Sequence, residues 1–315
     1  MGTQSEERPS ISQARKAAFQ VMAGGSAGFL EVCIMQPLDV VKTRMQIQTR
    51  PTFAATASST AENLSQVHYT GVFDCFAKMY RQEGISSYWK GLMPPILAET
   101  PKRAIKFLVF EQTKSLFQFG SPTPTPLTFS LAGLTAGTLE AIAVNPFEVI
   151  KVAQQADRQK KMVSTFEVAR DIVRRDGLGL RGLNKGLTAT MGRNGVFNMI
   201  YFGFYHSVKN VVPESKDHTW EFMRKVTIGF LAGTLACFVN IPFDVAKSRI
   251  QGPQPVANQI KYRGTLSSIA TVYKEEGFRA LYKGLVPKIM RLGPGGAIML
   301  LVFDYAYDYL LMNHS

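Results

Sequence analysis

Three copies of one pattern run along the chain, and this repeat limits the possible folds more than any other feature. In each copy a Gly-x-x-x-Gly pair precedes a proline, and the proline opens the motif Pro-x-[Asp/Glu]-x-x-Lys. The prolines are Pro37, Pro146 and Pro242, and each stands at the same distance from its glycine pair. A unit of about 100 residues that recurs three times predicts three equivalent structural units.

The rest of each unit repeats as well. An acid–glycine pair, such as Glu83 with Gly84, follows every motif, and a Lys-Gly step comes soon after it. A second apolar segment then closes the unit, so six apolar segments alternate with three polar connectors of helical pattern, for example residues 72–82 and 164–175. We therefore predict a polar tail over residues 1–14 and repeats over residues 15–118, 119–212 and 213–315.

The apolar segments are predicted to cross a membrane. Several are shorter than the roughly 18–20 apolar residues of a simple span, and the mean hydropathy of the chain is near zero. A large soluble helical protein is the alternative. However, glycine pairs allow membrane helices to approach closely, and charges within spans usually face a water-filled cavity. We therefore expect an all-α membrane protein with six transmembrane helices around an aqueous cavity.

The charge of the chain favours small anions as ligands. Its formal net charge is +13, but the basic residues are spread through every repeat, which argues against a nucleic-acid surface. A positive cavity that attracts anions agrees better with this distribution. The three cysteines lack metal-ligand spacing, no phosphate-binding loop is present, and no nucleophile–base set stands out. We expect no metal site, no cofactor and no catalytic residues, and hence no enzyme.

Two segments depart from the repeat. Residues 50–67, rich in Ala, Ser and Thr, occur in the first repeat only and are predicted to be a flexible loop insertion. Residues 1–13 have neither the apolar core of a secretory signal nor the acid-poor composition of a transit peptide. Any targeting information is therefore expected inside the repeats.

With its three Pro-x-[Asp/Glu]-x-x-Lys motifs, the chain resembles the mitochondrial carrier family over residues 15–311. The resemblance implies a three-fold pseudosymmetric barrel of six tilted helices with three short matrix helices. It places the chain in the mitochondrial inner membrane, with both termini towards the intermembrane space. It further implies a functional monomer in a bilayer that contains cardiolipin, with no nucleic-acid partner.

Longer runs refine this resemblance. Residues 94–103, 184–190, 242–256 and 289–296 are similar to carriers that exchange 2-oxoadipate and related acids for 2-oxoglutarate. The resemblance thus implies an antiporter of five- to seven-carbon oxo acids that works by alternating access. The alternatives are another anion carrier, for citrate or for 2-oxoglutarate/malate, and an uncoupling-type leak of protons or anions.

The repeated motif predicts a ring of ion pairs. Within each motif the acid and the lysine are close enough to pair on one helix face, and the proline is expected to kink the helix. Three-fold repetition also permits pairing between motifs: Asp39 with Lys151, Glu148 with Lys247, and Asp244 with Lys42. The resemblance favours this ring as the matrix gate. It also matches three glutamines to residues that brace the ring: Gln46, Gln155 and Gln251.

A weaker pattern, [Phe/Tyr]-[Asp/Glu]-x-x-[Lys/Arg], marks the second apolar segment of each repeat and is complete only in the first. The resemblance supports two links of a cytoplasmic gate: Glu111 with Lys209, and Asp304 with Lys114. Ordinary solvated helix ends are the alternative. Because this gate has fewer links than the ring, we expect the empty protein to favour the state open to the cytoplasmic side.

Cations within the second apolar segments are the candidate substrate ligands, since a buried charge needs a partner or an anionic ligand. Arg193 and Arg291 stand near the middle of such segments, whereas Lys102 and Lys106 share a helical face that Arg103 adjoins. The resemblance matches these positions, and Asn194, to the contact points that select substrate. Arginine suits a carboxylate, and Asn194 can donate to a keto oxygen. Alternatively, these cations only satisfy Glu99 or backbone carbonyls.

Overall fold

A computed structural model describes residues 13–49, 68–159, 162–214, 217–255 and 260–314. The predicted loop insertion at residues 50–67 and most of the tail lie outside these residues. The described chain contains six long helices: α1 (Gln13–Ile47), α4 (Met93–Leu116), α5 (Pro126–Ala156), α7 (Leu187–Val211), α8 (His218–Gln251) and α10 (Leu285–His314). Its short helices are α3 (Val72–Glu83), α6 (Thr165–Asp176) and α9 (Thr265–Glu276), with 3₁₀ turns η2 (Ile85–Trp89) and η3 (Phe278–Tyr282).

The order of the helices follows the sequence repeat. Each unit is a long helix, a short helix and a second long helix, which confirms the predicted alternation of apolar segments and polar connectors. The acid–glycine pair ends each short helix: Gly84, Gly177 and Gly277 follow α3, α6 and α9 with φ of 86°, 78° and 83°. Only glycine adopts this left-handed region without strain, so the repeated glycine stops the helix.

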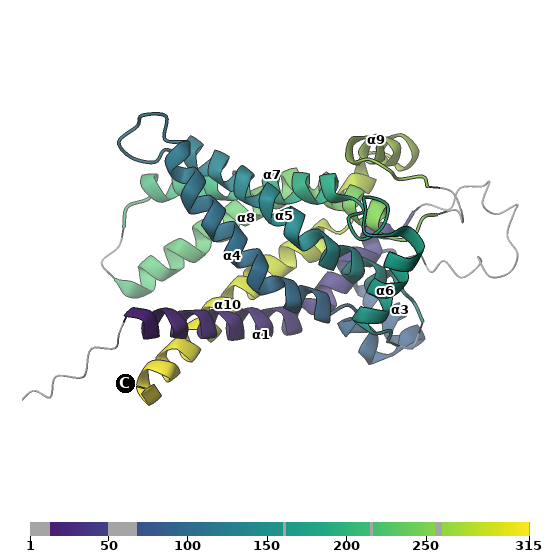
Figure 1. Cartoon of the computed structure of the whole chain (residues 1–315), viewed down its shortest axis with the longest axis horizontal. Coiled ribbons are helices and arrows are strands. Elements are labelled where there is room, and N and C mark those ends of the chain that lie inside the picture. The colour runs from purple at the N-terminus through teal and green to yellow at the C-terminus, as the bar shows by residue number, and fades with distance from the viewer. Residues whose placement is uncertain (1–12, 50–67, 160–161, 215–216, 256–259, 315) are drawn as a thin grey trace, which may run out of the picture.

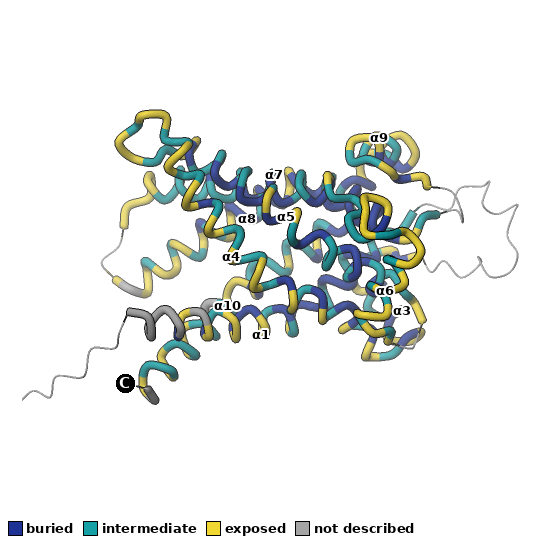
Figure 2. The backbone as a smooth tube through the Cα atoms, in the orientation of Figure 1, coloured by how far each residue is buried: buried dark blue, intermediate teal, exposed yellow. Residues whose placement is uncertain are grey.

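The long helices form a ring. Around it, α1 contacts α4 and α10, α5 contacts α4 and α7, and α8 contacts α7 and α10. Figure 1 shows the three short helices gathered at one end of the ring, here called the short-helix end. The start of α1 and the last turn of α10 both lie at the other end, here called the open end. Figure 2 shows that buried backbone is concentrated towards the short-helix end.

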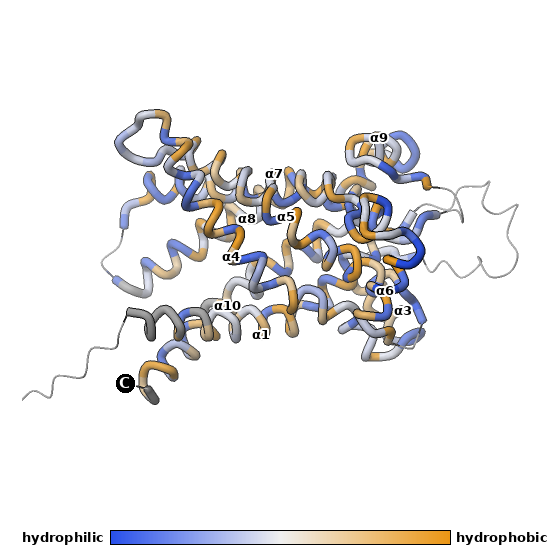
Figure 3. The backbone as a smooth tube through the Cα atoms, viewed as in Figure 1, coloured by the Kyte–Doolittle hydropathy of each residue, from blue (hydrophilic) through white to orange (hydrophobic). Residues whose placement is uncertain are grey.

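Three helices of the described chain are long and apolar enough to cross a membrane: Pro126–Ala156, Thr219–Gln251 and Phe278–Met312. The first of these begins at Pro126, and the Thr125 hydroxyl caps it by accepting a hydrogen bond from the Thr128 N–H. Figure 3 shows apolar and polar residues mixed along each long helix. This mixing is expected of helices with one face towards lipid and another towards a polar cavity.

The glycine pairs bring helices together in the second repeat only. A Cβ atom on Gly137 would lie 2.4 Å from the backbone oxygen of Asn194, and one on Gly133 would lie 2.7 Å from that of Asn198. The backbones of α5 and α7 are therefore in direct contact, as predicted for such pairs. In the first and third repeats, Gly28 and Gly233 meet only side-chain atoms of the second long helix, at 3.3 Å and 3.4 Å.

A buried ion-pair network fixes the short-helix end of the first repeat. Arg44 of α1 donates to both carboxylate oxygens of Glu83, and Lys90 Nζ lies 2.7 Å from Glu83 Oε2. Burial alone would raise the pKa of the Glu83 carboxyl, but the hydrogen bonds from Arg44 and Lys90 bring it below its ordinary value. Arg249, Glu276 and Lys283 repeat this arrangement in the third unit. The acid–glycine and Lys-Gly steps thus anchor the short helices to the ring.

Candidate functional site

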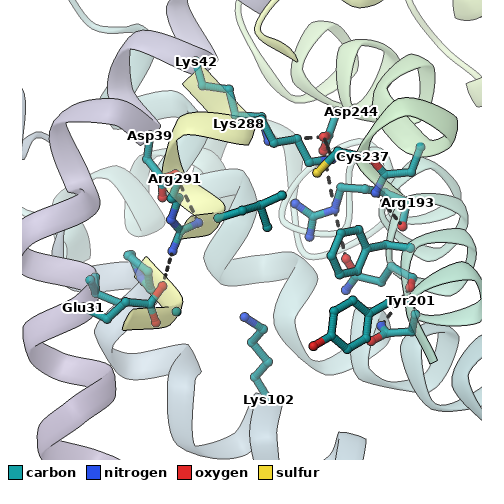
Figure 4. A pocket seen from close by; sticks show the side chains of 18 of the residues that line it. Glu31, Asp39, Lys42, Lys102, Arg193, Tyr201, Cys237, Asp244, Lys288 and Arg291 are labelled. Carbon is teal, nitrogen blue, oxygen red and sulfur yellow. Dashed lines mark hydrogen bonds and ion pairs between the residues drawn. The ribbon is translucent and has the colours of Figure 1, made fainter. Parts of the chain in front are cut away.

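The long helices enclose a polar cavity of about 840 Å³. Among the described residues, nine Lys and Arg side chains and six carboxylates line it, so cations are in excess. In a cavity with low-dielectric walls such an excess attracts small anions. Figure 4 shows Lys102 pointing into the space that Arg193 and Arg291 also line.

The predicted ring of ion pairs is present at the base of this cavity. Lys151 Nζ lies 2.7 Å from Asp39 Oδ2 and Lys42 Nζ lies 3.2 Å from Asp244 Oδ2. The third pair joins Lys247 to Glu148. Each link runs between two of the helices α1, α5 and α8, rather than within one helix. The pairing between motifs is therefore confirmed, while its role as a gate stays a prediction.

The three glutamines connect the same helices nearer the short-helix end. Gln155 of α5 accepts a hydrogen bond from Thr43 Oγ1 of α1 at 2.6 Å. Gln46 of α1 accepts from Ser248 Oγ of α8 at 2.7 Å, and Gln251 Nε2 of α8 donates to Asn145 Oδ1 of α5 at 3.0 Å. These bonds run parallel to the ion pairs and tie the helices together one turn further along.

Each acid of the ring also contacts a second cation, from α7 or α10. Arg193 Nη2 lies 2.6 Å from Glu148 Oε1, and Arg291 Nη1 lies 3.2 Å from Asp39 Oδ1. Lys288 donates to Asp244. The two arginines proposed from sequence as substrate ligands are thus held by acids of the ring.

Sequence reasoning missed Lys288 and the cavity acid Glu31. Lys288 precedes Arg291 by less than one helical turn, so a charge in the same apolar segment was the available signal. Glu31 Oε1 lies 3.2 Å from Arg291 Nη2, which gives that arginine two acidic partners. The sequence identified Arg291 as a cation in an apolar segment. Its acidic partners could not be identified in the same way, because they depend on how the neighbouring helices are shifted and rotated against α10.

The cations of α4 do not all reach the cavity. Lys102 and Lys106 line it, with Lys102 Nζ 3.8 Å from Glu99 Oε2 and Lys106 Nζ 5.9 Å from the centre of the Phe202 ring. Arg103 is not among the lining residues. Its Nε donates to Glu99 Oε1 at 2.6 Å, and its Nη2 contacts Met299 Sδ. For Arg103 the contacts agree with the alternative, in which the cation satisfies Glu99.

Asn194 is nearly buried and links the arginine beside it to α5. Arg193 Nε donates to Asn194 Oδ1 at 2.9 Å, and Asn194 Nδ2 donates to Glu140 Oε1 at 3.3 Å. Glu140 lies on the cavity wall and was also missed from sequence. These hydrogen bonds therefore orient the pair that is expected to contact substrate.

The open end has a different pattern of charges. Glu111 Oε2 accepts from Lys114 Nζ at 2.6 Å, within α4. Across the residues that the structure describes, neither the Glu111–Lys209 link nor the Asp304–Lys114 link is formed. The structure is thus linked at the short-helix end and unlinked at the other, and the cytoplasmic gate stays a prediction for the opposite state.

Comparisons with known proteins agree with this architecture. The family model described as "Mitochondrial carrier protein" matches residues 13–121, 123–216 and 218–314. The chain is 56% identical over 308 residues to the mitochondrial 2-oxodicarboxylate carrier of Homo sapiens, covering 97% of this chain and 99% of the relative. It is 41% identical over 297 residues to mitochondrial 2-oxodicarboxylate carrier 1 of Saccharomyces cerevisiae (92% and 93% covered). It is 38% identical over 298 residues to mitochondrial citrate transporter D of Aspergillus niger (92% and 93% covered).

Proposed function

The chain belongs to the mitochondrial carrier family, and from this premise we propose that it exchanges 2-oxodicarboxylates across the mitochondrial inner membrane by alternating access. Its substrates would be 2-oxoadipate, 2-oxoglutarate and similar five- to seven-carbon oxo acids. The names of its relatives in mammals and yeast support this substrate class. The observation in the structure that carries the proposal is the excess of cations among the residues that line the cavity.

A dicarboxylate would bridge the two groups of cations. One carboxylate would bind Arg193 and Arg291 in bidentate geometry, and the other would bind Lys102 and Lys106. Asn194, whose side chain lies beside Arg193, would donate to the keto oxygen. Because one methylene changes binding by only about 1–3 kcal/mol, oxo acids of neighbouring chain length should compete with each other.

Substrate binding would loosen the ring at the base of the cavity. On binding a carboxylate, Arg193 would exchange its contact with Glu148, and Arg291 its contact with Asp39, for contacts with the substrate. Each acid would then keep only its lysine of the ring. Only an anion that engages the arginines removes these contacts, so opening of the matrix gate is coupled to loading.

The opposite state would close the cytoplasmic gate. There Glu111 would exchange Lys114 for Lys209, and Asp304 would pair with Lys114. Two links oppose the three of the ring, so the empty protein would favour the state open to the cytoplasmic side. Both ends of the described chain lie at the open end, which supports termini that face the intermembrane space.

The remaining features of the proposal follow from the family. We assign transport rather than catalysis, with no cofactor and no nucleic-acid partner, because the relatives are named as transporters. The protein would act as a monomer in a bilayer that contains cardiolipin. Citrate is a second candidate substrate, because one relative over most of the chain is named a citrate transporter.

Uptake into liposomes tests these assignments. Internal 2-oxoglutarate should drive uptake of 2-oxoadipate, whereas internal ATP, carnitine or basic amino acids should not. Empty liposomes distinguish exchange from an uncoupling-type leak, which needs no counter-substrate. Strong ATP exchange without oxo-acid uptake would exclude the proposed substrate class, and citrate exchange that exceeds oxo-acid exchange would favour the second candidate.

A further inference from the structure

Glu140 of α5 is a buried acid on the cavity wall that the proposed transport cycle does not yet use. Only 2% of the residue is exposed, although it lines the cavity. Its Oε1 accepts one hydrogen bond, from the Asn194 amide at 3.3 Å, and its Oε2 has no hydrogen-bond partner. A buried polar atom without a hydrogen-bond partner costs free energy, so we expect this oxygen to contact a ligand or to carry a proton.

The other acids of the cavity differ from Glu140. Six carboxylates line it, and within the described residues the other five each form an ion pair: Glu31, Asp39, Glu99, Glu148 and Asp244. Glu31 occupies the position of Glu140 in the first repeat and pairs with Arg291, and Ala236 occupies it in the third. The unpaired acid is thus specific to the second repeat, where α5 and α7 are in closest contact.

The charged groups around Glu140 are those proposed to bind substrate. Three positive charges lie near Glu140, those of Lys102 and Lys106 on α4 and that of Arg193 on α7. One negative charge, that of Glu148 on the same helix α5, also lies near it. When a dianionic substrate binds to these cations, its two carboxylates would lie near Glu140. Like charges disfavour the ionised form of a carboxyl, so loading of substrate and ionisation of Glu140 oppose each other.

We propose that Glu140 binds the substrate as a carboxylic acid. The proton would sit on the unpartnered Oε2 and be donated in a hydrogen bond to a substrate oxygen, while Oε1 keeps the Asn194 amide. Each dianion loaded would take up one proton from the water of the open side, and the proton would leave to water when the substrate departs. This inference rests on the proposed oxo-acid exchange and adds a proton to its binding step.

The test is the pH dependence of 2-oxoadipate/2-oxoglutarate exchange, with equal pH inside and outside the liposomes, between about pH 6 and about pH 8.5, where the carboxyls of both substrates stay ionised. For the wild type we expect KM to rise on the alkaline side, by up to about tenfold per pH unit. Glu140→Gln keeps an amide donor but cannot titrate, so its KM should be independent of pH. The matched control is Glu31→Gln at the equivalent position, which should lower exchange but keep the wild-type slope.

Proton uptake gives a second measurement that does not need transport by a variant. Purified wild-type protein in weakly buffered detergent with a pH-indicator dye should take up about one proton per 2-oxoadipate bound at the alkaline end of the range. A wild-type KM independent of pH, a Glu140→Gln slope equal to that of the wild type, or binding without proton uptake would each overturn the proposal. Absence of oxo-acid exchange at every pH would instead refute the proposed function.

Discussion

Each acid of the ring contacts a second cation. We therefore predict that removing an acid of the ring destabilises the protein more than removing a lysine of the ring. Asp39 contacts Lys151 Nζ at 2.7 Å and Arg291 Nη1 at 3.2 Å. The change Asp39→Asn therefore leaves two cations without this acid, whereas Lys151→Gln leaves Asp39 paired with Arg291. We predict that Asp39→Asn lowers the free energy of unfolding of the empty protein more than Lys151→Gln does.

The magnitude follows from the burial of the partners. The exposed fractions of the side chains are 20% for Lys151 and 10% for Asp39, so screening by water is limited. Loss of one hydrogen bond to a charged group costs about 1.5–3 kcal/mol, and removing the acid from a buried ion-pair group costs about 3–5 kcal/mol. The expected difference of roughly 2 kcal/mol corresponds to about 4–8 °C in Tm, using about 2–4 °C per kcal/mol for a large domain.

The assay is thermal unfolding of purified, substrate-free protein in detergent for the wild type, both single variants and the double variant. The double-mutant cycle should give an interaction energy of about 1–3 kcal/mol between Asp39 and Lys151. Lys78→Gln is the matched control, because Lys78 pairs with Asp74 on α3, where both side chains are partly exposed. That change should cost at most about 1 kcal/mol.

Two results would refute this reasoning. Equal losses of Tm in Asp39→Asn and Lys151→Gln would mean that Arg291 does not support Asp39. Losses that add to within about 0.5 kcal/mol in the double variant would mean that Asp39 and Lys151 do not interact, and the ring would have to be redrawn.

Further predictions concern other parts of the molecule. Arg193→Ala and Arg291→Ala should each abolish exchange while the protein still inserts, since each loses a charged ligand contact worth about 1.5–3 kcal/mol; near-normal transport by either folded variant would make its arginine structural. Gly137→Ala should lower the free energy of unfolding by about 1–3 kcal/mol, because its Cβ would overlap the backbone of α7, whereas Gly233→Ala should cost less in the same melting experiment. Ala153→Arg should raise Tm by a few degrees, because it supplies the guanidinium that the other two repeats direct at their acid–glycine carboxylate; an unchanged Tm would show that the second repeat does not form this pair.

The ring could be predicted because three-fold repetition permits pairing between repeats and the family resemblance favours it. The acid and the lysine of each motif share one helix face, and equivalent helices around one axis bring each acid towards the lysine of another repeat. Pairing within one helix was equally open on spacing alone, and the family resemblance favoured the pairs Asp39–Lys151 and Lys42–Asp244 that the structure contains. A glycine directly after each polar connector is typical of a helix stop, so the sequence also carried a signal for the ends of the short helices.

The unequal use of the glycine pairs could not be predicted, because it depends on the facing helix. All three repeats carry the same small-residue pair, but the facing residues differ: α7 presents Gly195 and Gly203 to α5, which lets the two backbones approach, whereas between α8 and α10 the side chains of Phe230 and Leu292 stand against Gly293 and Gly233. In the first repeat the facing helix instead presents Glu99 and Arg103, whose side chains hold α4 away from Gly28. The glycine pair on one helix thus permits close contact, but the residues of the facing helix determine whether the two backbones meet.

The same dependence on partners explains the charges of the cavity. Sequence identified Arg193 and Arg291 as unusual because a cation in an apolar segment needs an anion, but it left open whether that anion is a substrate or an acid of the protein. In the structure the partners are acids of the protein, Glu148 and Asp39. If these contacts were permanent, the arginines would serve only structure. Because the same acids also hold lysines of the ring, the arginines can be withdrawn by a substrate without leaving either acid unpaired, and this exchange of partners connects binding to opening.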